Sequence, residues 1–209
     1  MVVQAQAGGA VTDGRRLRSA RTRQRSVEAA YRVFCERGYA APLTAIASEA
    51  GVSVQSLYAT FGTKLTLLRA VLQLAVHGDD DPRPPHEREW FAAMTAQPDP
   101  ERALLVLLEG TQGIYDRLGP LSGVFATSDP EIAALWEHSE RLRYEGLSTA
   151  VDVVLAKATA TVTRTQARDM AFVLLGPDTY QAFVTSRGWT PRAWRRWTAR
   201  TLATAWFTP

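Results

Sequence analysis

The stretch that decides the fold is residues 46–68, which read I-A-S-E-A-G-V-S-V-Q-S-L-Y-A-T-F-G-T-K-L-T-L-L. Apolar residues recur at helical spacing in its first part, and Gly51 then supplies the left-handed backbone conformation in which many helices end. Ser53 follows as a predicted cap, whose hydroxyl accepts from the backbone of Gln55 or Ser56. The pattern predicts either a helix-turn-helix or, as the plainer alternative, a helical hairpin with a solvated outer face.

The second helix of this pair is predicted to have one buried and one exposed side. Leu57 and Phe61, four residues apart, form the buried stripe. Small polar residues, one amide and one tyrosine share the outward side with a valine: Val54, Gln55, Ser56, Tyr58 and Thr60. This surface suits the edge of a base pair better than a partner protein, so the sequence favours the helix-turn-helix.

Residues from about Arg23 to Leu72 resemble the amino-terminal domain of the tetracycline-repressor (TetR) family. Three segments carry the resemblance: A-A-Y-R-V-F-C-E-R-G-Y, I-A-S-E-A-G-V-S-V-Q-S-L-Y and F-G-T-K-L-T-L-L. The resemblance implies an all-α, DNA-binding regulator of transcription. Base edges are expected to meet Thr44, Val54 and Gln55, whereas positions that mostly hold phosphates in the family are occupied by Ser56, Tyr58, Thr60 and Lys64.

The sequence departs from the family pattern at two places. Between Tyr39 and Ile46 the chain is one residue shorter than usual, and Pro42 stands where a Ser or Thr cap is common. Proline is tolerated at a first helical position, so the helix is still expected. Ser26 replaces an aliphatic residue of the first helix, which leaves the core-facing side to Val27, Ala30 and Phe34.

Composition predicts a folded protein without a membrane segment. The chain has 209 residues, 46% of them hydrophobic, which can bury a sizeable core. No apolar run approaches the roughly 20 residues that span a bilayer, and the first residues lack the features of a signal peptide, so a cytoplasmic location is expected. The single cysteine, Cys35, is interpreted as a core or boundary residue and not as a redox sensor.

Charge is distributed unevenly along the chain. Residues 1–77 contain ten Lys and Arg against four Asp and Glu, whereas residues 78–209 contain fourteen against seventeen. Six arginines fall between Arg15 and Arg25, which fits an arm that binds phosphates, or else a solvated tail. We therefore expect a basic, disordered arm over 1–18, a DNA-binding domain over 19–77 and a ligand-binding and dimerisation domain over 78–209.

Helical periodicity punctuated by glycine and proline predicts an all-α chain. Three helix starts are explicit, because Asp99, Asp129 and Thr190 each precede a proline at the first helical position. The expected helices are 19–37, 43–50, 54–61, 63–76, 87–96, 100–118, 130–157, 164–175, 178–187 and 191–207.

Catalytic and metal-binding motifs are absent from the sequence. There is no G-x-S-x-G, Walker or dinucleotide glycine motif and no Cys/His cluster, so neither an enzyme nor a cofactor is expected. His77 stands near Asp79, Asp80 and Asp81, but adjacent carboxylates in a proline-rich loop are normally solvated, and no metal site is predicted.

The second domain has two apolar helices, 100–118 and 130–157, which could simply pack together as a bundle. The family resemblance implies instead that they surround a ligand cavity, whose occupancy changes the spacing of two DNA-binding heads. The expected lining is rich in aromatic residues, which favours a small apolar or aromatic effector. It comprises Trp90, Phe91, Met94, Gln112, Tyr115, Phe125, Trp136 and His138, each of which has a plain core position as its alternative.

The last segment, 164–207, carries more apolar surface than a terminal hairpin needs, which often marks an interface. In the family the last two helices form a four-helix bundle with their symmetry mates, which implies a homodimer. The nearby arginines are expected at the solvated rim of that bundle: Arg192, Arg195, Arg196 and Arg200.

These features together predict a dimeric, ligand-responsive regulator that binds a palindromic operator in double-stranded DNA, acting as a repressor. The alternative is a helical ligand-binding or scaffold protein that no longer reads DNA. A helical enzyme is a third and more remote hypothesis. Salt dependence of duplex binding distinguishes the first two.

Overall fold

The computed structural model of the chain describes residues 8–78, 83, 87–126 and 129–207, with the backbone alone for 8–13 and 15. Every named element within these ranges is helical, as the sequence predicted. The chain divides into two compact units, Met1–Leu74 and Ala75–Pro209. The division falls inside a helix, a few residues before the boundary that the sequence suggested.

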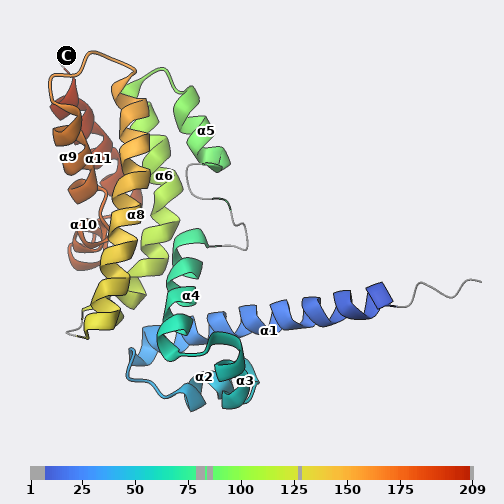
Figure 1. Ribbon diagram of the computed structural model, residues 1–209. Coiled ribbons are helices and arrows are strands. Elements are labelled where there is room, and N and C mark those ends of the chain that lie inside the picture. Colours follow the sequence, from blue (N-terminus) through green and yellow to red (C-terminus); the bar gives the residue numbers. More distant parts are fainter. Residues whose placement is uncertain (1–7, 79–82, 84–86, 127–128, 208–209) are drawn as a thin grey trace, which may run out of the picture. The chain divides into compact units, whose positions relative to one another are not determined.

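The first unit is a helix-turn-helix domain (Figure 1). Its helices are α1 (Gly8–Arg37), α2 (Leu43–Ala50), α3 (Val54–Phe61) and the greater part of α4 (Lys64–His77). The core-facing side of α1 is the expected one, since Val27, Ala30 and Phe34 are buried. Ser26 is also buried there, and its hydroxyl donates to the carbonyl of Thr22 at 2.9 Å. That bond satisfies the hydroxyl at a position where an aliphatic residue was expected.

The turn between α2 and α3 has the predicted geometry. Gly51 has φ +65°, and the amides of Gly51 and Val52 donate to the carbonyls of Ser48 and Ala47, which closes the end of α2. Ser53 caps α3 by accepting from the Ser56 amide at 3.1 Å. Pro42 lies before α2 as its cap residue, with an extended backbone, and not at the first helical position.

One expectation for this unit is wrong. The arm over 1–18 was expected to be disordered, but α1 begins at Gly8, and helix continues from there to Arg37 without a break. Arginine, alanine and leucine dominate residues 15–21 and are good helix formers, and no proline interrupts them. Residues 1–7 lie outside the described residues.

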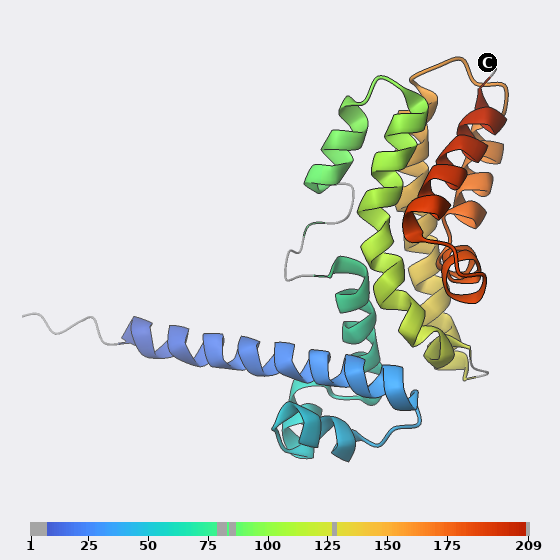
Figure 2. The ribbon, with the colours of Figure 1, turned by 180° about the vertical axis from the view of Figure 1, so that it is seen from behind.

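The second unit is a helical bundle (Figure 2). Helix α6 packs against α5, α8 and α11, and α8 packs against α9. The elements of this unit are α5 (Glu89–Ala96), α6 (Pro100–Leu118), η2 (Gly119–Leu121), α7 (Ser122–Phe125), α8 (Pro130–Leu155), α9 (Arg164–Leu174), α10 (Pro177–Gln181), η3 (Ala182–Ser186) and α11 (Pro191–Trp206).

The three predicted proline-headed helix starts are confirmed. Asp99 accepts from the Arg102 amide at 2.8 Å, Asp129 from the Ile132 amide at 3.3 Å, and Thr190 from the Ala193 amide at 3.1 Å. The expected helix 178–187 is instead the short α10 followed by the π-helical η3. None of the helices formed by the described residues is long and apolar enough to cross a bilayer.

Candidate nucleic-acid interface

Helix α3 presents the predicted polar face. Gln55, Ser56, Tyr58 and Thr60 are exposed and Val54 is half-buried, while Leu57 and Phe61 pack into the core. Tyr58 is a large side chain with 53% of its surface exposed. Thr44 is exposed on α2. The structure therefore leaves the residues expected to meet base edges accessible to a large partner.

Two hydroxyls on this face are already engaged within the helix. Ser56 Oγ lies 2.8 Å from Ser53 Oγ, and Thr60 donates to the Ser56 carbonyl at 2.8 Å. A hydroxyl that has donated its proton can still accept, but it must rotate before it can donate to a phosphate. Tyr58 and Gln55 are exposed on the same face, and both carry groups that could meet DNA.

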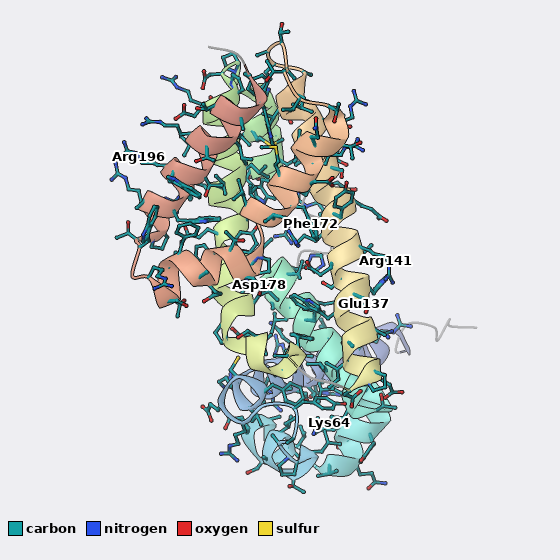
Figure 3. The ribbon with its side chains drawn as sticks, turned by 90° about the vertical axis from the view of Figure 1, so that its left-hand side faces the viewer. Lys64, Glu137, Arg141, Phe172, Asp178 and Arg196 are labelled. Atoms are coloured by element: carbon teal, nitrogen blue, oxygen red, sulfur yellow. The ribbon has the colours of Figure 1, made fainter. Side chains whose placement is uncertain are left out.

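Lys64, labelled in Figure 3, makes structural hydrogen bonds that the sequence did not suggest. Its ammonium donates to the carbonyls of Tyr39 and, at 2.7 Å, Ala41, and lies 4.5 Å from the centroid of the Tyr39 ring. Burial lowers the pKa of this half-buried ammonium below its usual value. Lys64 therefore holds the loop between α1 and α2 against the start of α4, and these two bonds use two of its three protons.

The start of α4 adds two hydroxyls that the sequence analysis missed. Thr63 caps this helix by accepting from the Thr66 amide at 3.0 Å, and the two threonine hydroxyls lie 2.9 Å apart. Both threonines are exposed beside Lys64 in the chain. The signal was available, because a threonine directly before a helical run is a typical cap.

Helix α1 is tied to both helices of the helix-turn-helix. The Arg23 guanidinium lies over the Phe61 ring of α3 at 5.1 Å, and Arg32 pairs with Glu49 of α2 at 2.9 Å. Both arginines are exposed, so the ion pair contributes little, about 0–1 kcal/mol. These contacts fix where α1 passes the end of α3.

The residues expected to line a ligand cavity in the second unit fall into separate groups. Trp90, Phe91 and Met94 belong to α5 and face α6, where a Cβ added to Gly110 would lie 2.4 Å from the Trp90 ring. Phe125 and Trp136 stack as a tilted pair with ring centroids 4.8 Å apart. Close approach of Trp90 to α6 therefore depends on glycine at position 110.

Tyr115 and Gln112 are engaged in the bundle itself. Tyr115 is buried, donates to the Leu175 carbonyl and packs with Tyr180 and Trp194, at centroid distances of 5.6 and 6.0 Å. Burial raises the pKa of Tyr115. Gln112 accepts from Arg195 of α11. His138, by contrast, is exposed on α8.

A polar row on α6 organises these contacts. The Gln112 side-chain amide donates to the carboxylate of Asp116, one turn further along the helix, at 3.2 Å. Asp116 also accepts from the Tyr180 hydroxyl at 2.5 Å. Burial and this bond raise the pKa of Tyr180 well above its usual value. The expectation that Arg195 lies on a solvated rim is wrong, because its side chain is only 19% exposed and lies 3.8 Å from Glu109. The spacing of Glu109, Gln112 and Asp116 could have revealed this row in the sequence.

A shallow, open hollow at the start of α6 is lined by Asp99, Glu101, Arg102 and Leu105. None of the residues expected to line a cavity contributes to it. That these residues line a ligand cavity therefore stays a prediction. Asp79, Asp80 and Asp81, considered with His77 as metal ligands, lie outside the described residues.

The surface near the carboxyl end carries an aromatic cluster, formed by Phe183, Trp189 and Trp197. Its ring centroids lie 4.8 to 5.9 Å apart, and Trp197 is 38% exposed. Arg196 points outward from α11 (Figure 3) and is exposed, as the sequence predicted. On α9, Val173 is 62% exposed. Aromatic rings clustered at a surface can mark an interface, whereas a single exposed apolar residue such as Val173 is common.

The glycine turn, the capped α3 with its exposed polar face, and the helical second unit define a helix-turn-helix protein of two helical domains. Residues 27–71 match the family model described as bacterial regulatory proteins, tetR family. The resemblance is thereby confirmed for this segment, which matches the amino-terminal, helix-turn-helix domain of the tetR family.

Solved structures extend this likeness to the whole fold. A Mesorhizobium loti protein assigned as a TetR-family regulator has 21% identity and a TM-score of 0.69, and the match covers 91% of this chain and 99% of that one. The transcriptional regulator FadR of Bacillus subtilis, solved with stearoyl-CoA, has 14% identity and a TM-score of 0.67, and the match covers 87% of this chain and 98% of that one. NalD of Pseudomonas aeruginosa is the secondary repressor of the MexAB-OprM multidrug efflux pump. It has 19% identity and a TM-score of 0.67, and the match covers 90% of this chain and 97% of that one. At these identities the likeness defines the fold alone. No curated protein matches the chain significantly.

Proposed function

We propose that the chain is a repressor of transcription that binds a palindromic operator as a homodimer and responds to a small ligand. The observation that carries the proposal is the exposed face of α3, where Gln55 and Tyr58 project from a helix whose opposite side is buried. A helix exposed along one face can enter the major groove, which is wide enough to admit it.

Residues on this face divide by the chemistry of their side chains. Gln55 can pair with an adenine through two hydrogen bonds, Val54 can contact a thymine methyl group, and Thr44 of α2 can join them. Ser56, Tyr58, Thr60 and Lys64 offer hydroxyls and an ammonium, which suit phosphate oxygens. The first set would choose the sequence, and the second would set affinity.

The carboxy-terminal surface supports a homodimer. The aromatic cluster and Val173 leave apolar area that a second copy could bury. A two-fold dimer presents the two α3 helices symmetrically, so its operator would be a palindrome with half-sites one helical turn apart.

The ligand is proposed to be small and largely apolar or aromatic. The half-buried rings of Trp90, Phe91, Phe125 and Trp136 support this, and Met94 adds an adaptable apolar group. The relative FadR was solved with stearoyl-CoA, which contains a long apolar chain. Tyr115, Gln112 and His138 support the ligand site less well, since the first two are engaged within the bundle and the third is exposed. The protein would act in the cytoplasm by binding alone, without a catalysed reaction.

The decisive experiment selects genomic DNA fragments on the purified chain and measures binding of one recovered duplex against a shuffled duplex of equal length. We expect preference for the recovered palindrome and a steep fall of affinity with salt. Weak binding that is equal for both duplexes would favour the alternative, a helical ligand-binding or scaffold protein. Repeating the selection with candidate apolar compounds tests the response to ligand.

A further inference from the structure

The amino-terminal half of α1, Gly8–Thr22, is the feature of the first unit that the proposed function leaves unexplained. It continues the helix beyond α2 and α3 (Figure 1). Gly8–Thr22 contains four arginines and one acidic residue, Asp13, and two more arginines, Arg23 and Arg25, follow directly. Arg16, Arg18, Arg21 and Arg25 are exposed.

We propose that this half of α1 is a second DNA-binding element, a basic helix that contacts phosphates beyond the base pairs covered by α3. The inference rests on the proposed function, because it requires that α3 binds a duplex. It adds a contact surface outside the helix-turn-helix, with the phosphate backbone of double-stranded DNA as its ligand.

The position of Arg23 is the first argument. Its guanidinium lies over the ring of Phe61, the last residue of α3, and Thr63 and Lys64 follow Phe61 closely in the chain. Those residues are candidates for phosphate contact in their own right. The extra length of α1 therefore leaves the domain at the edge where the DNA backbone is expected.

The arrangement of the arginines is the second argument. At 3.6 residues per turn, Arg18, Arg21 and Arg25 share one side of the helix, and Arg16 projects from the opposite side. A helix with cations on opposite sides can reach phosphates of both strands along a groove. Its length from Gly8 to Thr22, about 22 Å at 1.5 Å per residue, could follow several base pairs.

Repulsion between the arginines of this helix is the third argument for phosphate binding. Like charges three and four residues apart, as in Arg18, Arg21 and Arg25, repel one another and disfavour the helix. Phosphates between these side chains would remove that repulsion. A membrane surface fits less well, because Leu17 is the only large apolar residue among 14–25, and a helix that lies on lipid needs a broad apolar face.

The test compares two triple variants of the full chain on a duplex recovered by selection and on a shuffled duplex. Arg16→Ala, Arg18→Ala and Arg21→Ala together should lower the slope of log affinity against log salt by about two to three units. The loss should be equal on both duplexes, and the nuclease-protected region should shorten at its outer ends. The matched control replaces three exposed arginines of the second unit, Arg102, Arg141 and Arg187, by alanine and should change none of these.

Helical structure is tested separately. Ala20→Pro keeps every charge but interrupts the helix, and should reproduce part of the loss, whereas Ala20→Gln should bind as the unaltered chain does. If Ala20→Pro and Ala20→Gln bind DNA with equal affinity and equal salt slope, the arginines of Gly8–Thr22 act without being on a helix, and the proposal fails.

Other outcomes separate the two proposals. If the unaltered chain binds the recovered duplex specifically and the arm variant matches it in slope and footprint, the inference alone is overturned. A chain that binds no duplex overturns the proposed function instead. If the arm arginines govern binding to vesicles of phosphatidylglycerol and phosphatidylcholine but not to DNA, the arm belongs to a membrane surface and the inference is likewise wrong.

Discussion

At the scale of single residues, Gln55 is the side chain whose removal distinguishes base reading from backbone contact. It is exposed near the amino end of α3, where a recognition helix usually approaches the bases. Gln55→Ala should weaken operator binding by roughly 1–3 kcal/mol and relax the preference at one position in each half-site. Titration against a set of duplexes, each altered at one base pair, measures both effects. A loss that is uniform across the set would assign Gln55 to the backbone.

Lys64 should affect both stability and DNA binding. Lys64→Met removes the bonds to the Tyr39 and Ala41 carbonyls, and each charge-assisted bond is worth roughly 1.5–3 kcal/mol. We expect a lower melting temperature and a salt slope reduced by about one unit, with base preference unchanged. Arg37→Met, which removes an exposed cation, is the control for charge. A lower melting temperature with an unaltered slope would show that Lys64 only supports the fold.

Cys35 offers a pH-dependent test of the boundary position assigned to it. It is half-buried, and burial raises the pKa of its thiol. Because the thiolate is the nucleophile and a raised pKa lowers the thiolate fraction at pH 8, Cys35 should react slowly with a disulfide reagent in the folded chain. The rate should still be rising above the pH at which a free thiol has levelled off, and denaturant should abolish the difference. Reaction as fast as that of a free thiol would contradict the assignment.

At the scale of elements, the turn between α2 and α3 depends on the backbone of Gly51. Its φ of +65° disfavours any residue with a Cβ, although no atom lies within 4 Å of where that Cβ would stand. Gly51→Ala should therefore destabilise the domain by about 1–2 kcal/mol through conformation alone. Gly51→Asn is the control at the same site, because asparagine tolerates this conformation better and should cost less. Equal melting temperatures for the two variants would mean that the turn can relax.

Elements with local signals could be predicted closely from the sequence. Helices α2, α3 and α6 have the expected bounds, because a glycine end, a serine cap or a proline start marks each of them. The start of α1 could not be predicted in this way. Net charge suggested a solvated arm, whereas the intrinsic preference of arginine, alanine and leucine for helix extends α1 to Gly8.

Tertiary partners explain most of what the sequence missed. Lys64 fitted a phosphate contact by its place in the motif, but its bonds are to carbonyls of a loop about 25 residues earlier in the chain. Arg195 read as a surface cation, yet Gln112 and Glu109 of α6 hold it in the bundle. Contacts between residues far apart in sequence leave no local pattern, so only the exposed face of α3 was predictable residue by residue.

At the scale of the whole molecule, the proposed response to ligand requires coupling between the two units of each chain. If ligand and DNA favour different conformations, each must weaken the other by the same factor, because the coupling free energy is reciprocal. In the DNA-bound dimer the two half-site centres should lie about 34–36 Å apart. Ligand should change the distance between spin labels on the two copies of α3.

Trp136 provides the variant for this last prediction, because its ring stacks on Phe125 in the second unit and lies in the domain that does not contain α3. Trp136→Ala should reduce affinity for an apolar effector, and with it the effect of that effector, more than it reduces operator affinity measured without ligand. Leu142→Ala, at a position of α8 that is 54% exposed and that has no part in the proposed dimer surface, is the control for loss of an apolar side chain from that unit. Operator affinity is measured with and without effector, and effector affinity with and without operator, for the unaltered chain and both variants. Reciprocity requires the two coupling factors to agree for each protein.

If no compound that binds the second unit changes operator affinity, or if the spin-label distance is the same in both states, the regulatory half of the proposal is wrong, although DNA binding by α3 can still stand.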